Sequence, residues 1–320
     1  MRSGFAFFPS LRLLALAASL IISVTNVAKG QDHVDNPDEV CSGANLKSSA
    51  LVEDYDFRSY LTENDGACFQ VLKRGKIVFR RTVWSNTAYM IGQPGSTSDQ
   101  VPAIRNGADL TGRGHPNMIV SEWSGGAHCC LSHYVFELEP KFRLLAKLEA
   151  RDTWPAYFAD LDRDGRYYYI AEDWAFAYWL GSFGGSPNHE VILRWIDDDR
   201  GGGYHLALDK MQQPAPSPTE WREAIDKIRS DLATEKTGYV SSLPLDMWQE
   251  VMDLIYTGHP DLAWKFLDEA GPEAQRGKRD FDLESFCITL KESLYWPDLA
   301  RTLKDAPAKC LNARATPPKK

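Results

Sequence analysis

Hydrophobic and polar positions alternate in short runs along the first two thirds of the chain, which is the pattern of half-buried β-strands. Residues 69–83 carry apolar side chains on both sides of a polar turn. Gly75 in that turn supplies the positive φ that a tight turn needs, so the segment predicts a hairpin. Further strands are expected at 118–123 with 130–138, at 190–196 with 204–208, and at 173–180, where Trp174, Phe176, Tyr178 and Leu180 share one face.

The pattern changes near Met211, where a proline-rich connector over 211–218 ends the strand-like part. Ser217, Pro218 and Glu220 fit the N-cap, N1 and N3 positions of a capping box, and apolar residues then recur at helical spacing. The expected helices are 217–232, 245–256, 260–270 and 282–294. The two helices within 247–270 resemble one tetratricopeptide-like unit, and a small helical bundle is the alternative.

Residues 1–30 have the organisation of a secretory signal peptide. Arg2 and Arg12 precede an apolar stretch over 13–24, and small residues follow up to Gly30. An uncleaved anchor is the alternative. We therefore expect a periplasmic or extracellular protein, with a β-rich domain over 31–212 and an α-helical domain over 213–320, because a mature chain of this length suits two domains.

Mean hydropathy and net charge exclude one class of protein and one class of partner. Mean hydropathy is -0.37, which excludes a protein with many membrane spans. Removal of residues 1–30 leaves 33 basic and 44 acidic residues, a net charge of -11 that repels nucleic acid. The expected partner is an unknown small ligand, a glycan or a protein. Neither binding to nucleic acid nor stable membrane insertion after signal cleavage is expected.

All six cysteines lie in the mature chain, and an even number in an exported protein predicts disulfides. Cys287 and Cys310 share the last segment, so they are expected to pair. The pairing of the other four cysteines, Cys41, Cys68, Cys129 and Cys130, stays open. If Cys129 and Cys130 lie on a strand they point to opposite faces and bond to different partners, and a bond between the two is the alternative.

The segment 160–168, called the Asp160 loop below, has the pattern of a calcium site. Acidic residues at alternate positions suit a hard cation, and Gly165 at the sixth position allows the sharp turn. The pattern departs from an EF-hand because Tyr168 is a poor ligand and Ala171 stands where a glutamate is needed. A turn stabilised by side-chain to backbone hydrogen bonds is the alternative. The expected ligands are the carboxylates of Asp160, Asp162 and Asp164 and the backbone carbonyl of Arg166.

A looser copy of the pattern, called the Asp109 loop, spans 109–117. Its candidate calcium ligands are Asp109, Thr111 and Asn117, while Arg113 replaces the acid at the fifth position and opposes a bound cation. A strand-like run follows each loop. In these features residues 105–175 resemble the FG-GAP/VCBS type of repeat of integrin-alpha-like β-propellers, in which such a loop binds calcium within a blade.

The resemblance implies a fold and a cofactor. The fold is α+β and multidomain, with propeller-blade-like antiparallel sheets in the β-rich part and helices after it. About 180 residues suffice for three or four blades, so a closed ring is not expected. The implied cofactor is Ca²⁺.

Aromatic residues are dense between Trp154 and Phe183, with 11 in 30 residues. Trp174 and Trp179 are candidates for stacking on a ligand, with packing in a core as the alternative.

No catalytic residue is predicted, because no hydrolase, zinc-protease or phosphate-binding motif is present. We expect an exported non-enzymatic binding protein whose ligand is a carbohydrate or an envelope component. The alternatives are a secreted hydrolase with carboxylates near the Asp160 loop and an interaction adaptor that docks through residues 245–270.

Overall fold

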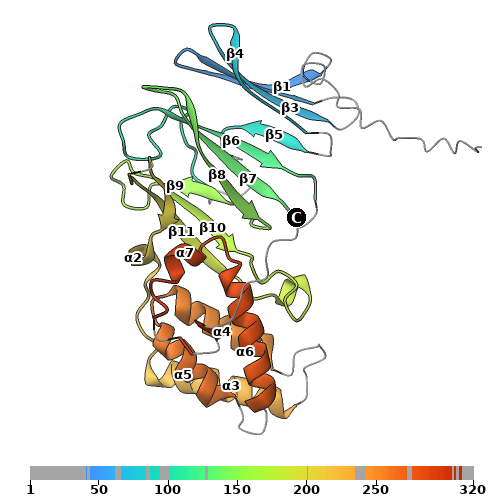
Figure 1. Cartoon of the computed structure of the whole chain (residues 1–320), viewed down its shortest axis with the longest axis vertical. Coiled ribbons are helices and arrows are strands. Elements are labelled where there is room, and N and C mark those ends of the chain that lie inside the picture. Colours follow the sequence, from blue (N-terminus) through green and yellow to red (C-terminus); the bar gives the residue numbers. More distant parts are fainter. Residues whose placement is uncertain are drawn as a thin grey trace, which may run out of the picture. The chain divides into compact units, whose positions relative to one another are not determined.

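A computed structural model provides the fold (Figure 1). The predicted signal peptide, residues 1–30, lies outside the residues that it describes. Those residues are 41, 44–61, 66–83, 87–93, 101–126, 129–199, 201–234, 243–271, 276–304, 306–307 and 310–311. Within these ranges no helix has both the length and the apolar character needed to cross a membrane.

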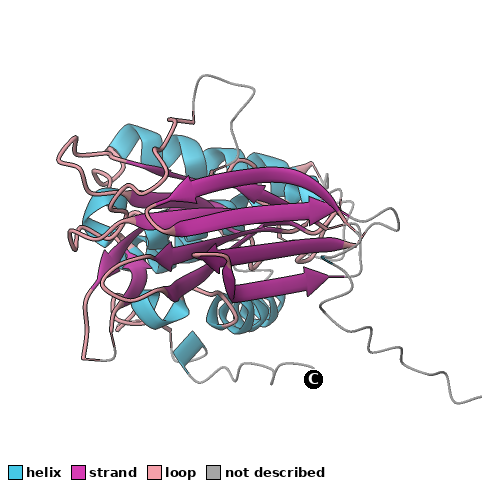
Figure 2. Ribbon diagram, turned by 90° about the horizontal axis from the view of Figure 1, so that it is seen from above, coloured by secondary structure: helices cyan, strands magenta, loops and turns pink. Residues whose placement is uncertain are grey.

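In the described part of the chain, strands that follow each other in sequence build three antiparallel sheets of four strands each. Figure 2 looks onto the strands of the first sheet. The first sheet contains β1 (Asn45–Val52), β2 (Tyr55–Leu61), β3 (Ala67–Lys73) and β4 (Lys76–Val83). The second contains β5 (Ala88–Ile91), β6 (Asn117–Trp123), β7 (Leu131–Glu137) and β8 (Arg143–Arg151). The third contains β9 (Tyr157–Ala159), β10 (Tyr168–Asp173), β11 (His189–Ile196) and β12 (Gly203–Leu206).

The predicted hairpin over 69–83 is confirmed as β3 and β4, with Gly75 at φ 78° in the turn. The strand predicted over 173–180 is wrong. β10 ends at Asp173, and the residues after it form turns in which Tyr178 and Leu180 have positive φ. The alternating residues do not share one buried face, because Phe176 is buried whereas Tyr178 is 60% exposed.

The two inner strands of the second sheet, β6 and β7, are buried on both faces. Met118 and Val120 of β6 join a core shared with the first sheet, while Ile119 between them joins a second core shared with the third sheet. Adjacent residues on a strand point to opposite faces, so a strand between two sheets buries consecutive apolar residues. This accounts for the unbroken apolar run Met118-Ile119-Val120.

Seven helical segments have their bounds within the described residues. The 3₁₀ helix η1 (Phe183–Gly185) lies between β10 and β11. The predicted capping box is confirmed at the start of α3, where Ser217 and Glu220 bond each other's backbone N–H groups. The α-helices are α2 (Leu208–Met211), α3 (Pro218–Ala233), α4 (Leu245–Tyr256), α5 (Pro260–Ala270), α6 (Arg276–Lys291) and α7 (Trp296–Leu299).

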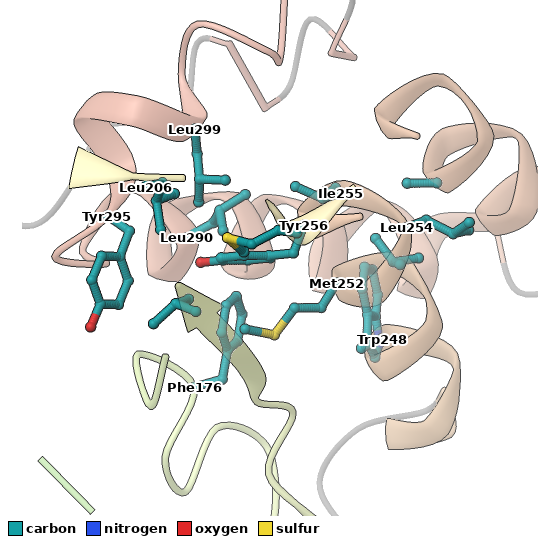
Figure 3. Packing of buried hydrophobic residues seen from close by; sticks show 14 of the residues in the cluster. Phe176, Leu206, Trp248, Met252, Leu254, Ile255, Tyr256, Leu290, Tyr295 and Leu299 are labelled. Carbon is teal, nitrogen blue, oxygen red and sulfur yellow. The ribbon is translucent and has the colours of Figure 1, made fainter. Parts of the chain in front are cut away.

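The helices and the third sheet share one hydrophobic core. Figure 3 shows Phe176 and Leu206 from the strand-rich part packed among Trp248, Met252 and Tyr256 of α4. A buried polar joint adds to this contact, because Asp173 accepts hydrogen bonds from the hydroxyls of Tyr256 and Ser293. Residues 36–320 therefore form one compact unit in which the strand-rich and helical parts predicted as separate domains are joined.

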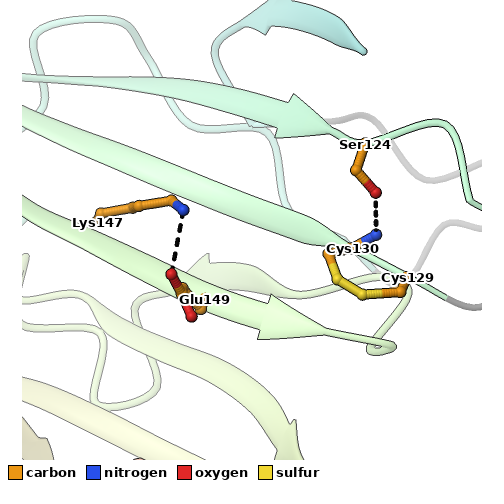
Figure 4. The surroundings of a disulfide bond; sticks show 5 residues. All are labelled: Ser124, Cys129, Cys130, Lys147 and Glu149. Atoms are coloured by element: carbon orange, nitrogen blue, oxygen red, sulfur yellow. Dashed lines mark hydrogen bonds and ion pairs between the residues drawn. A yellow bond between two sulfur atoms is a disulfide. The ribbon is translucent and has the colours of Figure 1, made fainter. Parts of the chain in front are cut away.

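Three disulfides are present. Cys287 on α6 is bonded to Cys310, the pair that the sequence predicts, and Cys41 is bonded to Cys68 on β3. Cys129 and Cys130 are bonded to each other, contrary to the expectation of different partners (Figure 4). That expectation assumed a strand, but both cysteines precede β7 in the turn after β6, where side chains need not alternate between faces. Ser124 Oγ accepts a hydrogen bond of 2.6 Å from the Cys130 amide.

Candidate ligand-binding site

A cavity of about 410 Å³ opens at one end of the second sheet, and we call it the aromatic cavity. Its walls are mostly apolar. Its polar side chains come from Arg151, which is the last residue of β8, and from Asp152 and Thr153, which follow it. Residues of the β6–β7 turn and of η1 complete it. The lining residues are Trp123, Gly126, Cys129, Leu131, Arg151, Asp152, Thr153, Trp154 and Phe183.

The antiparallel order of the strands brings these residues together. Trp123 is the last residue of β6, Leu131 the first of β7 and Arg151 the last of β8. Leu131 pairs with Trp123 on one side and with Arg151 on the other. In an antiparallel sheet the end of one strand lies beside the start of the next, so all three residues meet at the same edge.

Two indole rings on the rim have exposed surface. Trp154 is 60% exposed and Trp123 is 40% exposed. The connection that carries Trp154 is anchored by its neighbour Thr153, whose hydroxyl accepts a 3.0 Å hydrogen bond from the Glu172 amide of β10. Large exposed aromatic surface in a concave site is a feature of ligand binding rather than of folding.

Phe183 also lines the cavity, and the predicted stacking residue Trp174 packs on its ring. The two rings stack with centroids 4.6 Å apart and planes 11° apart. Trp174 Nε1 donates a 2.7 Å hydrogen bond to Glu172, which holds the indole in place. Trp174 is therefore a supporting residue of the cavity wall.

Trp179, the other predicted stacking residue, belongs to the core. It is 9% exposed, packs edge-to-face on Trp248, and its Nε1 donates to the Ser285 hydroxyl at 3.0 Å. The turns after β10 direct its side chain toward the helices, which a strand would not do. The residues of the cavity that sequence reasoning missed are Trp123 and Trp154, and the local signal for Trp154 is its position before a proline between two strands.

The two loops predicted to bind calcium occupy equivalent places in consecutive sheets. The Asp109 loop leads from β5 into β6, and the Asp160 loop leads from β9 into β10. Both contribute residues to one polar cavity of about 360 Å³, together with the end of β11. Residues of the two loops meet there, because a Cβ on Gly112 would lie 3.4 Å from the Arg166 side chain.

In the Asp160 loop the carboxylates bind donors of the protein. Asp160 accepts hydrogen bonds from the amides of Asp164 and Gly165, at 3.1 and 2.9 Å. Asp164 Oδ1 accepts one from the Arg166 amide at 2.9 Å. Asp162 accepts one from the Tyr168 hydroxyl at 2.7 Å and is paired with the ammonium of Lys210. Hydrogen bonding to Lys210 and Tyr168 lowers the pKa of Asp162.

In the Asp109 loop the carboxylate of Asp109 accepts hydrogen bonds from the amides of Thr111, Arg113 and Gly114. Asn117 accepts one from the Leu110 amide at 2.8 Å. Asp109 is the single carboxylate among the three predicted ligands. The side chains are therefore arranged as in a turn that is closed by its own backbone donors.

These arrangements do not fit a bound calcium ion, which needs six to eight converging oxygen atoms. Within the described residues no three His, Cys, Asp or Glu side chains are placed to hold one metal ion. Calcium binding at the two loops stays a prediction of the sequence pattern, and nothing in the aromatic cavity depends on it.

Comparisons of the chain with protein-family models, curated proteins and solved structures give no match. The geometry of the described residues therefore carries the functional argument by itself.

Proposed function

We propose that this is an exported, non-enzymatic binding protein that holds a neutral ligand with an apolar face in the aromatic cavity. The observation that carries the proposal is the pair of exposed indole rings, Trp123 and Trp154, which line one cavity together with a Phe183 ring that stacks on Trp174. A sugar ring has an apolar face that stacks on an indole and hydroxyls that hydrogen-bond to polar groups. Arg151, Asp152 and Thr153 contribute polar groups to the same lining, so carbohydrate is the first ligand class to test.

The three disulfides support an exported location, because such bonds persist in oxidising compartments. Together with the leader-like residues 1–30, they are the basis for proposing a periplasmic or extracellular protein.

We also propose that the three sheets are blade-like repeats of the FG-GAP/VCBS type in an open arrangement. Each sheet is a four-stranded antiparallel meander, and the two Asp loops stand between the first and second strands of consecutive sheets. Such a recurrence is the pattern of a repeat that stacks sheet upon sheet.

The two alternative functions have less support in the geometry. A hydrolase needs two carboxylates facing one substrate, but Glu172 is bonded to Trp174 and Asp173 is buried in its joint with Tyr256. An adaptor that docks through 245–270 needs an exposed apolar groove, but the apolar residues of α4 and α5 are buried in the core.

A glycan array tests the proposal directly, followed by calorimetric titration of the strongest neutral oligosaccharide. Replacement of Trp154 or Trp123 by Ala is expected to weaken binding by about tenfold or more, because a truncated central aromatic residue costs about 2 kcal/mol or more. Phe281→Ala is the matched control, since Phe281 is 70% exposed on α6 and does not line the cavity. Equal affinity of wild type and both tryptophan variants would refute the site.

A further inference from the structure

We propose that the ammonium of Lys210 takes the place of a divalent ion in the Asp160 loop, so that the loop is stable without a bound metal. Lys210 comes from α2, a short helix that follows β12. It is 48 residues from Asp162 in the chain, and only the packing of α2 beside the loop brings the two together.

The hydrogen bonds of the loop leave little room for a metal ion. Both oxygens of Asp160 accept backbone N–H groups, and both oxygens of Asp162 have a donor, from Tyr168 and from Lys210. One oxygen of Asp164 accepts a backbone N–H group, and the other lies 3.6 Å from Nε of Arg166. A calcium ion at Asp162 would have to displace the ammonium of Lys210, because two positive charges cannot share one carboxylate at close range without strong repulsion.

Tyr168 explains why an ammonium can replace the metal here. It stands at the ninth position, where the calcium pattern calls for an oxygen ligand. In the structure its hydroxyl donates to Asp162, and its ring lies 5.6 Å from Nζ of Lys210. The aromatic face attracts a cation without removing it from Asp162. The residue that departs from the calcium pattern therefore contributes to the ammonium site.

The Asp109 loop also has a basic residue in place of an acid, but its side chain has a different role. Arg113 stands at the position of the third acid, and its backbone N–H bonds Asp109. Its guanidinium leaves the loop, pairs with Glu137 at the end of β7 and lies 5.1 Å from the ring of Trp195 on β11. The carboxylate of Asp109 is thus satisfied by backbone N–H groups, while the positive charge of Arg113 connects the second and third sheets.

The test compares wild type with Lys210→Met, which keeps the length of the side chain and removes the charge. Calcium binding is measured by calorimetry, and the Tm is measured in EDTA and in about 5 mM CaCl₂, which exceeds the Kd of about 10⁻³ M of weak extracellular calcium sites. Wild type is expected to bind no calcium and to have the same Tm in both buffers. Lys210→Met is expected to have a lower Tm in EDTA and to regain about 2 °C or more with calcium, because the freed carboxylate oxygens then accept the ion.

Three further variants keep the result interpretable. Lys210→Arg retains the positive charge and is expected to stay insensitive to calcium. Lys147→Met removes an equal charge from the ion pair with Glu149 on β8, away from the loop, and is expected to behave as wild type. Adding Asp162→Asn to Lys210→Met is expected to abolish the gained response. Stoichiometric calcium binding by wild type, or a calcium-insensitive Lys210→Met, would overturn the proposal, and the wild-type titration decides even if a variant fails to fold.

Discussion

We predict that the buried side chain of His133 makes the stability of the fold decrease at low pH. His133 lies on β7 with no exposed surface and faces the third sheet, where its Nδ1 is 2.9 Å from the hydroxyl of Tyr169. Its ring packs edge-to-face on the Tyr169 ring, with centroids 5.4 Å apart. Burial disfavours the charged imidazolium and lowers the pKa of His133 to about 3.

The sign of the effect follows from comparing the two states. In the unfolded chain a histidine has a pKa of about 6.5, so below that pH the unfolded state binds a proton that the folded state does not. The free energy of unfolding therefore falls as the pH decreases from about 6.5 toward 3. At about pH 5 the contribution from this one residue is a loss of about 2 kcal/mol relative to about pH 8.

Urea denaturation at these two pH values measures the effect. His133→Phe keeps a planar ring and cannot titrate, so its free energy of unfolding should fall by about 2 kcal/mol less than that of wild type between pH 8 and pH 5. The variant also leaves the Tyr169 hydroxyl without its partner, which costs about 1–3 kcal/mol at both pH values. Other titrating groups are common to both proteins and cancel in the difference.

Val135→Ala is the matched control, because Val135 is fully buried on the same strand and faces the same core. It should lose stability equally at both pH values and keep the pH dependence of wild type. If wild type and His133→Phe lose the same stability on acidification, the assignment of His133 as a buried neutral group is refuted.

Two further predictions concern the stability of the fold. Replacing Cys287 and Cys310 by Ser should lower the free energy of unfolding by about 3 kcal/mol, because their bond closes a loop with a sequence separation of 23; denaturation of the oxidised wild type and of the variant measures the loss, and no difference would contradict the entropic account. Glu137→Gln should cost about 3 kcal/mol, since the Glu137 side chain is 2% exposed and its loss of charge leaves the Arg113 guanidinium, 15% exposed, without its buried partner. The exposed pair offers the comparison: Glu149→Gln should change stability by less than about 1 kcal/mol, and equal losses for the two glutamates would contradict the prediction.

The sequence was sufficient to predict those elements whose structure depends on residues close together in the chain. The hairpin of β3 and β4 follows from alternation around a turn glycine, and the start of α3 follows from the reciprocal capping of Ser217 and Glu220. Both depend on contacts within a few residues, so their patterns are visible without the fold. The loop motifs were visible for the same reason, since the Asp160 loop closes by hydrogen bonds between residues two to five positions apart.

The partners of those local elements were decided by the tertiary structure. Periodicity could not separate Trp179, which packs on Trp248 in the core, from Trp154, which is exposed at the aromatic cavity. The pairing of Lys210 with Asp162 likewise depends on the packing of α2, because Lys210 lies 48 residues after Asp162 in the chain. Side-chain chemistry and local turns are encoded in short segments, but which face is buried and which charge lies beside which depends on contacts between segments that are distant in the chain.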